Sequence, residues 1–251
     1  MSQKSNKTKS ATKREKLERA KKLQNEKRKK EDRIMWMILA GILAVVLIAA
    51  AIPLVNSLVK YNTVHYDLLD NTKYTVTNEV TDLVKMTIAY RADNGEKYVG
   101  DLLIRLDPQN APITTDNFQT LVRDGFYNGL TFHRLVEGLL IQGGDPEGTG
   151  IGGSGHTITG EFALNDIENN LKHVRGTISM ARSDAFNSAS SQFFIVQKDW
   201  PSWDGAYAAF GTVLYGMETV DGMSSIKADD FGNPYNEAYI EAAVFVKEVQ
   251  Q

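Results

Sequence analysis

The sequence contains no cysteine among its 251 residues. This absence excludes disulfide bonds, zinc–thiolate sites, thiol catalysis and acylation of the lipoprotein type. It leaves the redox compartment open, because a chain of this length can bury a core without disulfides. The sequence has only four histidines, and none has a partner at metal-binding spacing such as H-E-x-x-H. The residues therefore predict no metal and no other cofactor.

Charge of either sign is absent from residues 34–55, IMWMILAGILAVVLIAAAIPLV, and this run of 22 residues has no polar face. A helix of this length would measure ~33 Å, against ~30 Å for the hydrocarbon core of a bilayer. A cleaved signal peptide is the alternative, since residues 49–51 are small. The charged leader and the apolar run are both longer than is usual for a signal peptide, however. We predict an uncleaved transmembrane helix at residues 34–56.

The charges of the chain are divided unevenly. Residues 1–33 hold 14 of the 28 Lys and Arg but only 5 of the 31 Asp and Glu, which leaves the remainder acidic. This division predicts a basic arm at 1–33 and a separate acidic body. Because positive flanks stay cytoplasmic, we expect the arm inside the cell and the body outside the cytoplasm. The arm mixes both signs, which favours a solvated tail over a site for lipid headgroups or nucleic acid.

Short alternating patterns dominate the part of the chain that follows a predicted juxtamembrane linker at 57–82. The turn signal Asp93-Asn94-Gly95 lies between two of the predicted strands. We predict strands at 84–90, 98–106, 176–182, 192–197, 208–214 and 239–249. We also predict two helices, one around Phe118 that is capped by Thr114 or Thr115 and stops at Gly125, and a short one at 216–226. This pattern indicates a mostly antiparallel sheet in a domain at 83–251.

The glycine-rich stretch Gly150–Gly155 fits G-x-G-x-x-G, but HTITGEF follows it, and this is not a helix start. No lysine makes it a phosphate-binding loop either, so we predict a flexible surface loop at 143–155. Ser, His and Asp all occur, but without the G-x-S-x-G context of a hydrolase. His133 is predicted to be a structural histidine with its hydrogen bonds satisfied.

Arginine 134 stands in an apolar run, FHRLVEGLLIQGGD at 132–145. Since arginine cannot shed its charge, Arg134 either points to solvent or acts in a pocket. A second informative stretch is SQFFIV, in which Gln192 and Phe194 share one face of a strand and Phe193 takes the other. A third is WDGAYAAFGTV at 203–213.

Together with NAPITTDNF at 110–118 and GTISMA at 176–181, these stretches resemble the cyclophilin family of peptidyl-prolyl cis-trans isomerases, over about residues 84–249. The resemblance implies a mostly β fold, a closed eight-stranded antiparallel barrel capped by two helices, here preceded by one transmembrane helix. The active groove would lie on the outer face of the barrel. Arg182 and Tyr207 resemble bacterial members of the family.

The resemblance also implies roles for single residues. Arg134 would be the catalytic arginine, Gln142 would orient it, and Phe194 would form the floor of a proline pocket. The usual Trp falls on Ser202, and a Leu pair stands where Phe-Met is common, which weakens one wall of the pocket. The substrate-binding residues implied are Leu139, Leu140, Ala181, Arg182, Gln192, Trp203 and Tyr207.

Such a site requires neither a nucleophile nor a cofactor. Rotation of a peptide bond has a barrier of ~18–20 kcal/mol because the nitrogen lone pair is shared with the carbonyl, and X–Pro bonds exchange slowly. A donor aimed at the prolyl nitrogen would stabilise the twisted state. The expected substrates are proline-containing unfolded or nascent polypeptides outside the cytoplasm. The alternative is a membrane-tethered module that binds proline peptides or acts as a chaperone without catalysis, and the oligomeric state stays open.

Overall fold

The computed structural model describes residues 3–249, so residues 1–2 of the predicted arm and 250–251 of the predicted domain lie outside the described residues. The chain divides into two compact units, Met1–Leu58 and Val59–Gln251. The first unit is supplied by α1, a helix at Gln3–Asn62 with Pro53 inside it. Its segment Lys21–Val59 is long and apolar enough to cross a membrane, with a mean hydropathy of 2.9 and none of the apolar window buried. Residues 57–62 of the predicted linker are therefore helical.

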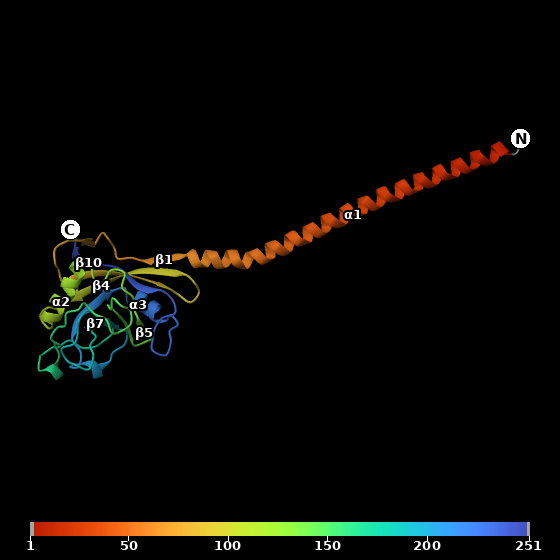
Figure 1. Ribbon diagram of the computed structural model, residues 1–251. Helices are drawn as coiled ribbons and strands as arrows, with labels where there is room; N and C mark the ends of the chain where they lie inside the picture. Colours follow the sequence, from red (N-terminus) through yellow and green to blue (C-terminus); the bar gives the residue numbers. More distant parts are fainter. Residues whose placement is uncertain (1–2, 250–251) are drawn as a thin grey trace. The chain divides into compact units, whose positions relative to one another are not determined.

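The second unit is built on a ten-stranded sheet in the order β2-β10-β3-β4-β9-β7-β8-β6-β5, with β1 paired to β4 (Figure 1). Only the β1–β4 ladder is parallel among the described strands. The strands are β1 Val64–Asp67, β2 Tyr74–Val76, β3 Leu83–Arg91, β4 Lys97–Leu106, β5 Arg134–Val136, β6 Leu140–Gly143, β7 Thr177–Met180, β8 Phe193–Val196, β9 Ala209–Tyr215 and β10 Ala238–Glu248. The six predicted strands are confirmed as β3, β4, β7, β8, β9 and β10, with ends that differ by one or two residues.

The predicted closed, eight-stranded barrel is wrong in its closure and in its strand number. The path of strands begins at β2 and ends at β5, and no ladder joins these ends. At the seam, Thr131 makes isolated bridges to Asp145 and Tyr239. The segment before β5 turns repeatedly, with Gly125 and Gly129 in left-handed conformations, and such a backbone cannot sustain a ladder. The sheet is therefore open, and isolated backbone bonds cross its seam.

The predicted linker at 57–82 contributes two strands to the sheet. β1 lies beside β4, and β2 lies beside β10. Leu69 packs with Leu103 and Val246 in a small second core, and its backbone N–H donates to the buried carboxylate of Asp101 at 3.0 Å. All four residues of β1 are exposed, and the alternation of apolar and polar residues in Val-His-Tyr-Asp could have indicated this strand.

The two α-helices of this unit are α2, Pro112–Arg123, and α3, Met217–Ser224. α2 ends before Gly125 as predicted, but the predicted threonine cap is wrong, because the helix begins at Pro112 and Thr114 lies buried inside it. The carboxylate of Glu161 caps the helix instead: it accepts from the backbone N–H groups of Ile113 and Thr114 at 2.9 and 2.7 Å. This cap comes from 48 residues away, so no local pattern predicts it.

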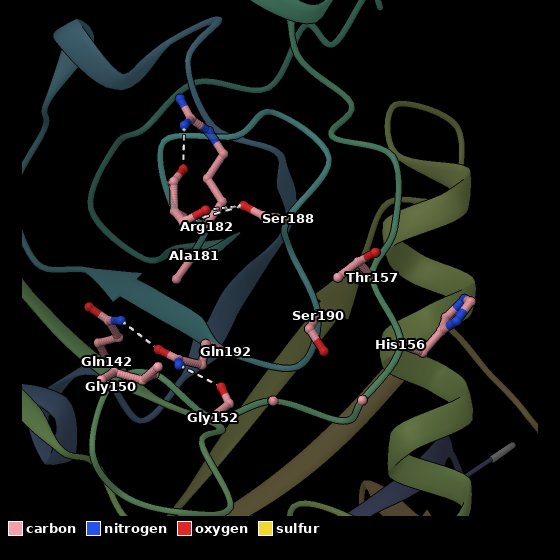
Figure 2. Close-up of a pocket in the computed structure, with 14 residues that line it drawn as sticks. Gln142, Gly150, Gly152, His156, Thr157, Ala181, Arg182, Ser188, Ser190 and Gln192 are labelled. Carbon is pink, nitrogen blue, oxygen red and sulfur yellow. Dashed lines mark hydrogen bonds between the residues drawn. The ribbon is translucent and has the colours of Figure 1, made fainter.

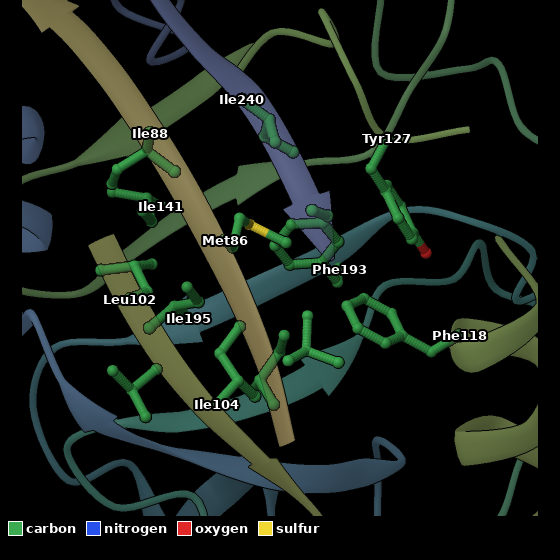
Figure 3. Packing of buried hydrophobic residues seen from close by; sticks show 14 of the residues in the cluster. Met86, Ile88, Leu102, Ile104, Phe118, Tyr127, Ile141, Phe193, Ile195 and Ile240 are labelled. Atoms are coloured by element: carbon green, nitrogen blue, oxygen red, sulfur yellow. The ribbon is translucent and has the colours of Figure 1, made fainter. Parts of the chain in front are cut away.

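The main hydrophobic core is formed by side chains from the strands and from α2 (Figure 3). Met86 and Ile88 come from β3, Phe118 from α2, and Phe193 from β8, and all are fully buried. Because side chains alternate along a strand, the inward position of Phe193 turns its neighbour Phe194 to the outer face. The core thus sets the orientation of the strand that carries the candidate site.

Candidate active site

The β5–β6 hairpin places the predicted catalytic pair together. In its register Arg134 lies opposite Gln142, and Val136 lies opposite Leu140. Leu135 points into the core, so its neighbour Arg134 faces outward and is exposed. The Nη1 of Arg134 donates to Oε1 of Gln142 at 3.5 Å, the long end of hydrogen-bond range. This arrangement confirms the proximity of the two residues, and most guanidinium donors are left for another partner.

The outer face of β8 provides an apolar floor beside this pair. Phe194 lies opposite Gln142 in the β6–β8 ladder and is only 4% exposed. Phe194, Leu140 and Val196 form a buried cluster that is separate from the main core. Half-buried side chains pack around the cluster: Val136, Leu139, Ala181, Trp203 and Tyr207. The structure thus brings the predicted floor and the predicted walls together in one apolar cluster.

Two aromatic side chains, Trp203 and Tyr207, pack against Phe194 in this cluster. Trp203 ends the short helix η2, Pro201–Trp203, and its ring meets Phe194 edge-on at 5.2 Å. Tyr207 meets Phe194 edge-on at 5.6 Å. Trp203 therefore packs against Phe194, although the resemblance places the family's usual Trp at Ser202. The ring of Trp200 packs on that of Trp203, with 5.6 Å between the ring centroids. Edge-on aromatic contacts of this kind contribute ~0.5–1.5 kcal/mol each beyond their buried area.

A buried histidine supports the floor from behind, and sequence reasoning did not assign it. The ring of His173 is stacked with Phe194 at 6.1 Å. Its Nε2 lies 3.0 Å from Oγ of Ser179, and its Nδ1 lies 3.2 Å from Oδ1 of Asp204. Burial lowers the pKa of His173, and the hydrogen bond that its ring donates to Asp204 opposes this shift. The three partners come from separate segments, so only the fold reveals the support.

A chain of hydrogen bonds runs from the arginine into a second pocket. Figure 2 shows the part of this chain from Gln142 through Gln192 to Gly152. The Nε2 of Gln142 donates to Oε1 of Gln192 at 2.9 Å, and the Nε2 of Gln192 donates to the carbonyl of Gly152 at 2.8 Å. Gln192 was predicted to contact the substrate backbone, and in the structure its amide joins Gln142 to the glycine-rich loop.

The second pocket has a volume of about 550 Å³. Its lining consists of Gln142, Gly150, Ile151, Gly152, Gly153, Gly155, His156, Thr157, Ala181, Arg182, Ser183, Ser188, Ser190 and Gln192. Ala181 also packs against the apolar cluster of Phe194, Leu140 and Val196, so this cluster and the second pocket are neighbours. Sequence reasoning missed this pocket because it treated the glycine-rich stretch as a surface loop only.

That loop is organised by one buried carboxylate. The oxygens of Asp145 accept from the backbone N–H groups of Glu147, Thr149, Gly150 and Gly152, at distances from 2.6 to 3.2 Å. These bonds lower the pKa of Asp145, although burial works against them. The predicted flexible loop is therefore tied down over residues 147–152, and the Gly-Gly-Asp signal that precedes it could have indicated this.

Arg182 lies at the rim of the second pocket, but its guanidinium is engaged within the protein. It lies 4.9–5.2 Å from the ring centres of Phe162, Phe186 and Tyr207. Its Nη2 donates to the carbonyl of Ala206 at 2.9 Å. The Arg182 side chain, which was predicted to contact substrate, thus lies between the second pocket and Tyr207 of the apolar cluster.

His133, beside the arginine, is buried as predicted, but neither ring nitrogen has a hydrogen bond within residues 3–249. The prediction of a fully hydrogen-bonded histidine is therefore wrong. Burial lowers its pKa, with Asp145 opposing and Arg134 reinforcing the shift. Among the described residues no group of three His, Asp or Glu side chains could hold a metal ion.

Comparisons with known proteins agree with this geometry. The family model described as cyclophilin type peptidyl-prolyl cis-trans isomerase/CLD matches residues 90–244. Peptidyl-prolyl cis-trans isomerase-like 1 of Gibberella zeae is 40% identical over 157 residues, which are 62% of this chain and 95% of that protein. A peptidyl-prolyl cis-trans isomerase of Helicobacter pylori is 40% identical over 146 residues, or 58% of this chain and 81% of the relative. A fungus and a bacterium match equally well, so the bacterial likeness stays a prediction.

A solved structure shows the same fold. The crystal structure of a Cryptosporidium parvum cyclophilin type peptidyl-prolyl cis-trans isomerase, obtained in the presence of the dipeptide Ala-Pro, has 32% sequence identity and a TM-score of 0.54. The match covers 63% of this chain and 98% of that one. With its family match over more than half of its length, the chain belongs to the cyclophilin family and is a peptidyl-prolyl cis-trans isomerase.

Proposed function

We propose that Arg134 catalyses the rotation of X–Pro bonds by donating a hydrogen bond to the prolyl nitrogen. When the peptide bond twists, the nitrogen lone pair localises and becomes an acceptor. The planar ground state offers hardly any such acceptor, so the bond favours the transition state selectively. The observation that carries the proposal is the position of Arg134: it is an exposed cation opposite Gln142, and Gln142 in turn lies opposite Phe194 of the apolar cluster.

The apolar cluster and the arginine have different roles in this proposal. The apolar cluster around Phe194 and Leu140 binds the proline ring, while the other side of the bond rotates. Gln142 holds the guanidinium through the bond between Nη1 and Oε1, and Gln192 holds Gln142 in turn. No covalent intermediate forms, and the proton of the guanidinium stays on the arginine throughout.

The test compares Arg134→Ala and Arg134→Lys with the unaltered full-length chain in detergent. The removal of one preorganised donor costs roughly 10²–10³ in rate. We expect a loss of this order for alanine and partial activity for lysine, which lacks the planar fork. Exchange NMR on a proline peptide measures the rate, and peptide titration measures affinity, which should change much less. Peptide binding without exchange by the unaltered chain would indicate a binding module instead.

We further propose that the enzyme acts outside the cytoplasm, anchored through residues 34–56. The length and hydropathy of α1 support an anchor, and the basic arm supports an inside N-terminus. The substrates would then be unfolded or nascent proline-containing polypeptides that have crossed the membrane.

Protease digestion of intact, wall-stripped cells tests this topology. We expect the domain at 83–251 to be digested and the 1–33 arm to be protected. Protection of the domain until the membrane is broken would reverse the orientation, and a soluble domain cut near Ala51 would replace the anchor with a signal peptide.

A further inference from the structure

The loop between α3 and β10, residues 227–236, holds two large aromatic side chains in solvent. Phe231 is 80% exposed and Tyr235 is 70% exposed. Single exposed apolar residues are ordinary on protein surfaces, so exposure alone indicates little. Two further features of this loop bear on the function of the two rings. They are its internal hydrogen bonds and its contact with the strand of Arg134.

The conformation of the loop is fixed from within. The Oδ1 of Asp229 accepts from the backbone N–H groups of Phe231 and Asn233, both at 2.9 Å. The side chain of Asn233 donates to Oδ2 of Asp229 at 2.8 Å, and these bonds lower the pKa of Asp229. The backbone N–H of Tyr235 donates to the carbonyl of Lys227 at 3.0 Å. The rings are therefore presented on a preorganised turn.

The tip of the loop lies directly on the strand of the catalytic arginine. The carbonyl of Gly232 accepts from the backbone N–H of Leu135 at 2.8 Å. Gly232 is buried and has a φ of +90°, and a Cβ there would lie 3.1 Å from Cγ of Arg134. A side chain at this position would clash, so glycine lets the loop approach the aliphatic part of Arg134. Phe231 is thus one residue away from a direct contact with the active site.

The opposite side of the groove has a different character. The second pocket, beyond Gln142 and Gln192, is lined mainly by glycine, serine and threonine. The loop at 227–236 therefore provides two large exposed rings on a turn that contacts the strand of Arg134. A substrate chain that passes Arg134 would meet this loop.

We propose that Phe231 and Tyr235 bind an aromatic or large aliphatic residue of the substrate, within about three residues of the proline, on the Arg134 side of the groove. An extended chain advances ~3.3 Å per residue, so three residues span ~10 Å, and the contact of Gly232 with Arg134 places the loop beside a chain that passes the arginine. Rigid aromatic side chains offer contact area at low entropic cost. Folded proteins bury such apolar residues, so this contact selects unfolded segments. The inference rests on the proposed function, because it extends the same groove.

The test uses the full-length chain in detergent with a series of peptides. Each peptide has one proline in an alanine background, and each carries one Phe at one of three positions before or after the proline. With the unaltered chain, we expect Phe at one or more positions on one side to raise kcat/KM about 3- to 10-fold over the all-alanine peptide, the range of one aromatic contact. The double variant Phe231→Ala/Tyr235→Ala should bring this ratio close to one.

Two matched variants sharpen the result. Tyr66→Ala removes an aromatic side chain of similar exposure, 68%, from β1, outside the groove, and should keep the ratio. Tyr235→Phe keeps the ring and should keep most of the preference, which separates ring contact from disturbance of the loop. Melting curves check that each variant is folded.

A preference that is absent in the unaltered chain, or that survives in the folded double variant, would overturn this inference while leaving the isomerase function intact. Absence of exchange with every peptide, the all-alanine one included, would overturn the proposed function and the inference with it.

Discussion

The buried cluster around Phe194 and the second pocket lie side by side, since Ala181 contacts both, yet they are built by different means. The cluster consists of side chains on strands and on η2: Phe194 and Leu140 are nearly fully buried, and Trp203 packs edge-on against Phe194. The second pocket is lined in large part by a glycine-rich loop held by Asp145. The cluster therefore depends on side-chain packing, and the second pocket depends on the hydrogen bonds that hold a loop in place.

The largest effect is expected from Phe194→Ala, which breaks the cluster alone. The truncation of a buried phenylalanine costs about 3–5 kcal/mol of stability through lost burial and the cavity left behind. We expect a large drop in the melting temperature and weak binding of proline peptides. Denaturant unfolding and peptide titration measure the two effects.

The control for this change is Leu164→Ala, at a residue that is 62% exposed on the short helix η1, Ala163–Asn165. Its stability should stay within ~0.5 kcal/mol of the unaltered chain. A Phe194 variant as stable as this control would show that the floor is not a packed element.

Asp145→Ala should break the second pocket alone. The carboxylate holds four backbone N–H groups, and hydrogen bonds to charged groups contribute ~1.5–3 kcal/mol each before relaxation. We expect a loss of ~2–3 kcal/mol in stability and faster amide hydrogen exchange at Gly150 and Gly152. Exchange at residues 193–196 should be unchanged in the native state, since their bonds lie in the sheet.

Glu147→Ala is the matched control, because this exposed residue lies in the same loop and only its backbone bonds to Asp145. If both carboxylate variants gave the same exchange pattern, the anchoring role of Asp145 would be wrong.

Arg182→Ala should affect both pockets, because this residue braces the wall between them. Loss of its cation–π contacts should cost about 1 kcal/mol at this partly exposed site. We expect NMR shift changes at Tyr207 in the proline pocket and at Ser183 in the second pocket. Arg182→Lys should restore the charge but not the stacking, so its shifts should stay closer to those of the alanine variant. Changes confined to one pocket would contradict the bracing role.

The last effect concerns the dependence of stability on pH. Burial lowers the pKa values of His133 and His173, so protonation favours the unfolded state, where histidine titrates near 6.5. Stability is therefore complete above about pH 6.5 and falls as the pH drops below it, by at most ~1.4 kcal/mol per pH unit for each histidine. Melting curves between pH 7.5 and 5 measure this slope.

His173→Gln should be less stable at pH 7.5, because it loses the buried ring behind Phe194, but its stability should depend less on pH. The exposed His156, replaced in the same way, should leave the slope unchanged. An unaltered slope in the His173 variant would assign the pH dependence to other groups.

Local patterns were enough to predict six of the ten described strands and the face of Phe194. Alternation along SQFFIV turned Phe194 outward because Phe193 occupies the core, whereas no pattern predicted the β5–β6 hairpin, and the pairing of Arg134 with Gln142 came from the family resemblance. Periodicity carries this information because strand geometry repeats every two residues. The apolar run at 34–55 likewise predicted a long helix from composition alone.

Only the tertiary structure decided the features that join distant segments. The cap of α2 by Glu161, the support of Phe194 by His173 and Asp204, and the approach of Gly232 to Arg134 depend on residues that are far apart in the sequence. The same holds for the places of β1 and β2 in the sheet, which follow from the backbone partners that β4 and β10 offer them. Backbone hydrogen bonds and helix caps depend on position in space and hardly on side-chain type, so sequence determined which side chains are apolar, while the fold alone determined which of them meet.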